Sequence, residues 1–286
     1  MPSDTSESLL RCIAPRGAPV PVVFDSPHSG MRYPEDFGSI APLSVLRRSE
    51  DAFVDELYSA APDHGAPLIA ADFPRIYIDP NRALIDLDPA MLDGPWPDPL
   101  VASRKTELGV GLIWRVMPPD SQIYDRLLSV AEVRRRIETF WKPYHAAVAK
   151  AIDDTHARFG QVWHINCHSM PEMGNSGTED GPVARAEFVL GDRDGTTCAP
   201  AFTAFVAEQL DSLGYEVKLN EPYKGVELVR RYSDPENGRH SLQVEINRKL
   251  YMDEERIEKN GGFDALKANI DRLIAAICAY ARETVA

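Results

Sequence analysis

Two stretches of this chain run from apolar residues into a polar turn that carries a histidine. Residues 22–30 contain His28 and residues 162–171 contain His168, and in both stretches a serine follows the histidine. This pattern is typical of buried strands that end at the edge of a parallel sheet, where α/β proteins place their pockets. One such histidine would be explained as an ordinary hydrogen-bonded side chain. The repeated pattern favours metal ligation.

The rest of the chain alternates predicted strands with predicted helices. This alternation indicates the α/β class, with a mostly parallel, mixed central sheet. We expect one domain over residues 1–286, with residues 1–19 as a loose arm. Besides 162–168, the apolar runs predict strands at residues 20–24, 67–72, 75–79, 110–117, 186–190, 215–219 and 241–247. Helical spacing predicts helices at 52–61, at 129–159 with a kink or break at Pro143, at 198–213 and from 262 onward.

Composition limits the partners and the compartment. The 286 residues carry a net charge of −13, from 31 basic and 44 acidic side chains, which disfavours nucleic acid and anionic membranes. A small anionic substrate is still compatible if the pocket is locally basic. The chain has no apolar run near the ~20 residues of a membrane helix, and its polar start predicts the cytoplasm. Four scattered cysteines suit a reducing compartment and argue against a disulfide framework or a cysteine zinc site.

A catalytic zinc site takes three protein ligands, so two histidines leave a carboxylate to be found. Asp25, Glu50 and Asp51 are the candidates near the same sheet edge. Asp51 precedes a helical pattern and could instead cap that helix, and the sequence does not decide between the two roles. Glu50 is the fallback ligand. Asp25 could alternatively orient His28 from behind.

A hydrolase of this kind also needs a general base and groups that bind the substrate. Glu245 is the candidate base, because it alternates with apolar residues on a short predicted strand; a solvent-facing edge strand would explain the same pattern. Asn81 and Arg82 follow a predicted strand and a proline, and arginine suits a carboxylate because its fork donates two parallel hydrogen bonds. Arg115 is the other candidate. Structural ion pairs are the alternative for both arginines.

Several ordered segments together make the chain resemble the N-formylglutamate amidohydrolases. The most specific are Phe-Asp-Ser-Pro-His-Ser-Gly at 24–30, Asn-Cys-His-Ser-Met at 166–170 and Gln-Val-Glu-Ile-Asn-Arg at 243–248. Further matches lie at 50–58, 78–82, 111–116, 123–124, 136–145 and 220–225. Residues 226–232 depart from the family pattern, which has another glycine and a threonine-containing segment there. We expect this segment to cover the pocket and to affect specificity.

The resemblance implies a three-layer α/β/α sandwich similar to the zinc carboxypeptidases, with one zinc ion at the sheet edge. It implies hydrolysis of N-formyl-L-glutamate to formate and L-glutamate, a late step of one histidine degradation route. By position in this sequence, the implied residues are the ligands His28, Asp51 and His168, the base Glu245, and the substrate-binding residues Asn81, Arg82 and, less directly, Arg115.

Two alternatives stay open at this stage. One is a carboxypeptidase-like or aspartoacylase-like hydrolase of another N-acyl amino acid or a small peptide. The other is a non-catalytic protein that binds an anionic metabolite in the same pocket. The ligand set prefers zinc, although two histidines and a carboxylate also suit iron or cobalt.

Overall fold

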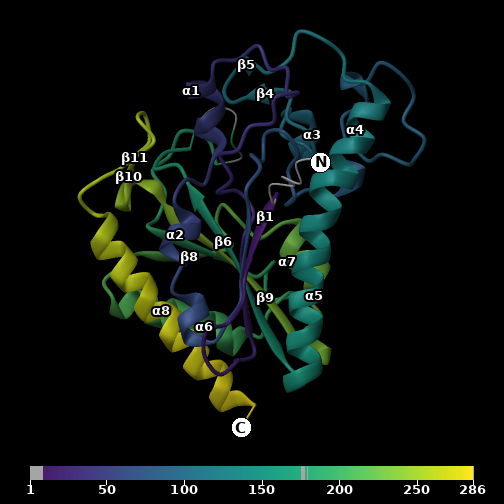
Figure 1. The fold of residues 1–286 in the computed structure, drawn as a ribbon. Coiled ribbons are helices and arrows are strands. Elements are labelled where there is room, and N and C mark those ends of the chain that lie inside the picture. Colours follow the sequence, from purple (N-terminus) through teal and green to yellow (C-terminus); the bar gives the residue numbers. More distant parts are fainter. Residues whose placement is uncertain (1–8, 175–177, 179, 286) are drawn as a thin grey trace, which may run out of the picture.

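The computed structural model describes residues 9–174, 178 and 180–285 (Figure 1). A seven-stranded sheet runs through it in the order β1-β3-β2-β6-β9-β7-β8. The strands are β1 (Leu10–Ile13), β2 (Val22–Ser26), β3 (Leu68–Ala71), β6 (Val162–Met170), β7 (Phe188–Gly191), β8 (Val217–Leu219) and β9 (Arg239–Asn247).

The sheet is mostly parallel, with one antiparallel pairing towards each edge. Strands β3, β2, β6 and β9 pair in parallel, and so do β7 and β8. Strand β1 runs antiparallel to β3, and β7 runs antiparallel to β9. The predicted mixed, mostly parallel sheet is therefore confirmed. The expectation of a loose arm is wrong for Leu10–Ile13, which form edge strand β1; residues 1–8 lie outside the described residues.

Helices cover both faces of the sheet and give three layers (Figure 1). On one face α2, α6 and α8 pack over apolar side chains such as Phe24 and Ile165. On the other face α5 packs over β2, β3 and β6, while α7 packs over β6 and β9. The helices are α1 (Leu43–Leu46), α2 (Val54–Leu57), α3 (Arg104–Glu107), α4 (Val130–Arg136), α5 (Lys142–Phe159), α6 (Pro200–Ser212), α7 (Glu227–Tyr232) and α8 (Phe263–Thr284).

The long helical pattern is interrupted as its proline predicts. A π-helical turn, Ile137–Trp141, joins α4 to α5, and Pro143 is the second residue of α5. Proline lacks the N–H that would continue the α-helical bonds, and π turns are one way to absorb such a defect. The predicted helix over 52–61 is shorter, with only Val54–Leu57 α-helical in α2.

Two predicted strands are wrong. The segment 75–79 is a turn in which the guanidinium of Arg75 donates to the carboxylate of Asp79 at 2.9 and 3.1 Å. Residues four apart in a strand would lie roughly 13 Å from one another, so this ion pair requires a curled backbone. The segment 110–117 is also mostly irregular, and only Val116–Met117 form a short strand, β4, against β5 (Ser121–Gln122). The remaining two-stranded sheet pairs β10 (Met252–Asp253) with β11 (Glu258–Lys259).

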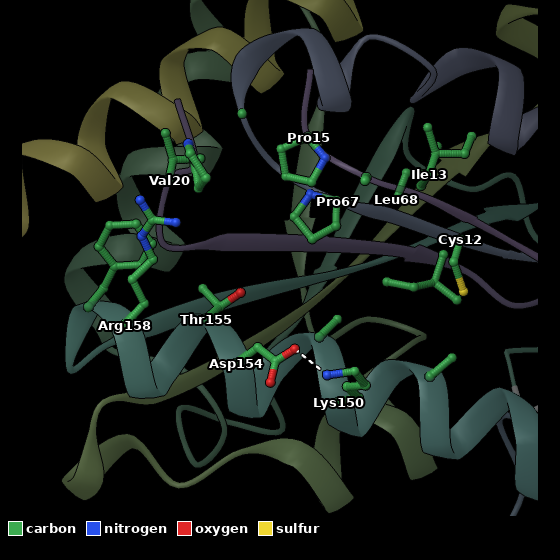
Figure 2. A pocket seen from close by; sticks show the side chains of 17 residues that line it. Cys12, Ile13, Pro15, Val20, Pro67, Leu68, Lys150, Asp154, Thr155 and Arg158 are labelled. Atoms are coloured by element: carbon green, nitrogen blue, oxygen red, sulfur yellow. Dashed lines mark hydrogen bonds and ion pairs between the residues drawn. The ribbon is translucent and has the colours of Figure 1, made fainter. Parts of the chain in front are cut away.

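A cavity of about 540 Å³ opens between β1, the start of β3 and helix α5 (Figure 2). Its strand side is apolar, with Ile13, Val20 and Leu68, and its helix side carries an ion pair of 2.6 Å between Lys150 and Asp154. The cavity lies where β2 and β3 begin, whereas the two histidine stretches are at strand ends. Within the described part of the chain, no helix is both long and apolar enough to cross a membrane.

Candidate metal centre

The two predicted histidines meet where neighbouring parallel strands end. His28 follows the last residue of β2 by two positions, and His168 lies near the end of β6. The strands are in register, with Asp25 paired to Asn166. Both histidines are buried, and their ring centroids are 4.7 Å apart. The sheet edge inferred from the repeated pattern is therefore the place where these side chains come together.

The loop after β2 is held by close backbone contacts. A Cβ on Gly30 would lie 2.2 Å from the carbonyl oxygen of Phe73, so only glycine allows this approach. Ser29 Oγ donates to the carbonyl oxygen of Asp51 at 3.1 Å, and the Asp51 N–H donates to the carbonyl oxygen of His28 at 3.0 Å. These bonds tie the first histidine to the segment that carries the third candidate ligand.

Asp51 completes the cluster. Its Oδ2 atom lies 3.3 Å from His28 Nδ1 and 3.0 Å from His168 Nδ1. One ligand atom from each of the three residues lies within 4.8 Å of the others, so the group could hold a metal ion. The capping role is wrong, because α2 has no side-chain cap. The fallback ligand Glu50 instead accepts hydrogen bonds from Tyr33 and Arg47.

The outer nitrogen of each histidine is bound to an acceptor. His28 Nε2 donates to Asp79 Oδ1 at 2.8 Å, and His168 Nε2 donates to Asn166 Oδ1 at 2.7 Å. Such partners fix the tautomer and leave the Nδ1 lone pairs directed at the centre. Burial lowers the pKa of His168 to about 4, so its imidazole is neutral near pH 7, as metal ligation requires.

Asp25 supports His168, through Asn166, rather than His28. Its carboxylate accepts hydrogen bonds from Tyr144 Oη at 2.7 Å, from His164 Nε2 at 2.7 Å and from Asn166 Nδ2 at 2.9 Å. The last bond fixes the orientation of the Asn166 amide, whose oxygen therefore faces His168. The suggestion that Asp25 orients His28 is thus wrong, since Asp79 does so.

Two arginines balance the buried carboxylates. Arg248 donates to Asp51 Oδ1 at 3.0 Å, and Arg75 pairs with Asp79 and lies 3.8 Å from Asp51 Oδ1. Burial opposes the charged form of Asp51, but its contacts with the two histidines and the charge of Arg75 outweigh it and lower the pKa of that carboxyl well below its usual value. The sequence reasoning missed Arg75, Asp79 and Arg248. The signal for the first two was a pair of charges flanking the apolar run 76–78.

Glu245 lies beside the cluster on a central strand. In the register of β6 and β9 it is paired with His168, and its other neighbour is Val189 of β7. The edge-strand alternative is therefore wrong. Gln243 Nε2 donates to Glu245 Oε1 at 2.8 Å. Burial, and then the charge of Asp51, raise the pKa of Glu245 to about 8.

The structure places Asn81 at the cluster and Arg82 beside it. Asn81 Nδ2 is 3.1 Å from His168 Nε2, while its Oδ1 accepts the N–H of Leu228 at the start of α7. Arg82 is buried and donates to the carbonyl oxygens of Val110 and Asn81. The unpredicted helix α7 thus contacts Asn81 through its backbone, and its role in covering the pocket stays a prediction.

Among the described residues, no contact links Arg115 to the cluster. Its Nε donates to Asp88 at 3.0 Å, its Nη2 donates to the carbonyl oxygen of Glu107, and its side chain is 43% exposed. This is the ion pair that sequence reasoning gave as the alternative. A role in binding substrate stays a prediction for this residue.

Known proteins resemble the chain over nearly its whole length. A crystal structure of N-formylglutamate amidohydrolase from Ralstonia eutropha JMP134 is 48% identical, with a TM-score of 0.92, and the match covers 96% of this chain and 99% of that one. The N-formylglutamate deformylase of Pseudomonas aeruginosa is 29% identical over 278 residues, which cover 93% of this chain and 96% of the relative. The gene product Atu2144 from Agrobacterium tumefaciens, 19% identical with a TM-score of 0.65, shares the fold.

A family model adds the assignment. The model described as N-formylglutamate amidohydrolase matches residues 20–252, a span that includes the three ligand candidates and Glu245. The relatives' names support a hydrolase that acts on an amide, and the sequence resemblance is confirmed. From the matched span and the 48% identity to a solved member, the chain belongs to the N-formylglutamate amidohydrolase family.

Proposed function

We propose that this protein hydrolyses N-formyl-L-glutamate to formate and L-glutamate, with one zinc ion held by His28, Asp51 and His168. The observation that carries the proposal is the convergence of two Nδ1 atoms and one carboxylate oxygen, all buried, in a member of this family. The relatives named N-formylglutamate deformylase support the substrate. The sequence expectation of a cytoplasmic enzyme belongs to the same proposal.

The donor set fits zinc on chemical grounds. Two neutral imidazoles and one carboxylate are the three protein ligands of many catalytic zinc sites, which leave a further position open. Asp79 and Asn166 hold the outer nitrogens of the histidines, as second partners of zinc ligands commonly do. A zinc ion bound here would polarise the formyl carbonyl and lower the pKa of a water molecule from ~16 toward ~7.

Glu245 supplies the proton transfers in this proposal. Its carboxylate accepts a proton from the attacking water as the new carbon–oxygen bond forms. It then gives that proton to the nitrogen of the departing glutamate as the carbon–nitrogen bond breaks. The raised pKa of Glu245, about 8, suits a group that must both accept and release a proton near neutral pH.

Asn81 and Arg82 are proposed to bind the substrate α-carboxylate. Asn81 lies against His168, so a carboxylate held by this pair would keep the adjacent amide near the metal ligands. Arginine suits a carboxylate because of its paired donors. Arg115 is a further candidate for the second carboxylate, and it would have to exchange Asp88 for the substrate.

The test combines metal content with formate release. Purified protein should contain about one zinc per chain and release formate from N-formyl-L-glutamate, and a chelator should abolish that release. Formyl, acetyl and peptidyl substrates should be compared in the same assay. Zinc without formate release, but with hydrolysis of another acyl group, would favour the carboxypeptidase-like or aspartoacylase-like alternative. No metal and no turnover after adding zinc would favour the binding protein.

A further inference from the structure

Gln243 is buried, and its one side-chain hydrogen bond to the described residues goes to the proposed base. Its Nε2 donates to Glu245 Oε1 at 2.8 Å, and its exposed fraction is 1%. Its own Oε1 has no hydrogen-bond partner among the described residues. A buried acceptor without a donor is unfavourable, so this orientation of the amide is maintained by Glu245 and not by a second partner.

The neighbouring strand repeats the same arrangement. In the parallel register of β6 and β9, Asn166 is paired with Gln243 and His168 is paired with Glu245. Side chains two residues apart on a strand point to the same face, so all four lie on one face of the sheet. On β6 the amide of Asn166 holds His168, and on β9 the amide of Gln243 holds Glu245.

The chemistry of the amide determines what it can hold. An ionised carboxylate accepts hydrogen bonds only, so it requires the amide nitrogen and not the amide oxygen. The bond occupies Oε1 of Glu245 and leaves Oε2 without a partner from Gln243. A carboxylate fixed at one oxygen presents the other in a defined direction, which proton transfer over hydrogen-bond distances requires.

We propose that Gln243 is the positioning residue of Glu245. It holds Oε1, so that Oε2 is the oxygen that takes the proton from water and returns it to the leaving nitrogen. This inference rests on the proposed function, because it assigns Glu245 the role of base.

The variant Gln243→Met tests this role, because methionine has nearly the same length and no donor. With zinc bound, kcat for formate release should fall on the order of 100-fold, while KM and zinc content stay near those of the parent protein. The acidic limb of the pH profile of kcat/KM should move to higher pH, because the ionised form of Glu245 loses a donor.

A second readout does not depend on turnover. In the metal-free protein, the Glu245 carboxyl carbon can be titrated by NMR, and Gln243→Met should raise its pKa. Gln243→Asn keeps an amide but is one methylene shorter, and it carries the same expectations if the methionine variant fails to fold. Val244→Ala is the matched control, since Val244 lies on the opposite face of β9 in the apolar core. Val244→Ala should lower stability but leave the pH profile of kcat/KM and the NMR titration of Glu245 unchanged.

The outcomes of these measurements distinguish a positioning role of Gln243 from a packing role. Parental kcat and pH profile in Gln243→Met would overturn the positioning role. Equal losses in Gln243→Met and Val244→Ala, with no change in the carboxyl titration, would reduce Gln243 to a packing residue and overturn it as well. If the parent protein releases no formate, the substrate proposal fails, and the carboxyl titration alone then supports or overturns the hold of Gln243 on Glu245.

Discussion

At the residue scale, each ring nitrogen of His28 faces the carboxylate of a different aspartate. Nε2 donates to Asp79, while Nδ1 faces Asp51, which also faces the second histidine. Asp79 in turn accepts from Arg75 and from Trp114 Nε1. Several hydrogen bonds therefore fix the position of Asp79. Because Asp79 is not itself a ligand, a substitution there should change metal affinity without removing a ligand.

We predict that Asp79→Asn weakens zinc binding by about 10- to 100-fold. The amide keeps the size of the side chain but removes the charge that supports the protonated Nε2 of His28. Competition with a fluorescent chelator measures the affinity. Glu50→Gln is the control, because Glu50 precedes Asp51 but contacts Tyr33 and Arg47 instead. Equal affinity in both variants would contradict the role given to Asp79.

We expect Glu245→Gln to keep zinc and to lose turnover by at least about 100-fold, the scale of general acid–base catalysis. His168→Ala should differ in kind, since it removes a ligand and should lose metal together with activity. Metal analysis of the two proteins beside a formate assay distinguishes these outcomes. Near-normal turnover in Glu245→Gln would remove this residue from the role of base.

The sequence pattern identified the candidate metal ligands, but it could not decide whether Asp51 is a ligand or a helix cap. Both roles need the same residue before the same apolar pattern. The deciding contact, with His168, joins residues 117 positions apart, and no local pattern reports such a distance. Asp79 was overlooked for the same reason, because its partner His28 lies 51 positions away.

At the scale of elements, the loop after β2 positions its histidine by fitting closely against the residues that follow β3. Gly30 allows that contact with the backbone of Asp72 and Phe73. We predict that Gly30→Ala lowers the free energy of unfolding by about 1–3 kcal/mol, because the added carbon forces the backbones apart. It should also weaken metal binding, since the loop carries His28.

Thermal unfolding and metal affinity of Gly30→Ala measure these effects. Gly261→Ala is the control, because a Cβ there meets no atom within 4 Å. Similar stability of the two variants would show that the loop can move without cost.

The elements that periodicity predicted well are the long ones. Helix α8 has a long helical apolar pattern, and strands β6 and β9 have long runs in which apolar and polar residues alternate. The structure has all three near the predicted positions. The segment 75–79 has an apolar run of strand-like length, yet Arg75 and Asp79 at its ends pair with one another and curl the backbone. Helix α7 is short and highly charged, and its stability depends on packing over the sheet, which no local pattern encodes.

At the scale of the whole molecule, the buried ionisable groups make stability depend on pH. The pKa of Glu245 is raised by burial to about 8, so the protonated form stabilises the folded state, and this contribution is lost as the pH rises through 8. The pKa of His168 is lowered to about 4, so its contribution is complete above 6.5 and is lost as the pH falls. Between pH 6.5 and 8, of these two groups, Glu245 alone changes stability.

We therefore predict that the free energy of unfolding of metal-free protein falls between pH 6.5 and 8. The slope should reach at most about 1.4 kcal/mol per pH unit, the limit for one proton. Denaturant unfolding with chelator present measures it, and Glu245→Gln should abolish the slope. An equal slope in that variant would assign the effect to other groups.

The ligands are dispersed along the chain, and this has a consequence for the order of folding. The contacts of the cluster join positions 23 and 117 residues apart, and the supporting bond from Asn166 to Asp25 spans 141. Closing such loops is slow, and contacts of long separation form only once the elements between them are in place. His28 and Asp51 are close in sequence, but His168 joins them only when β6 lies beside β2. The complete three-ligand site therefore forms with this strand pairing, and we expect tight metal binding to follow it.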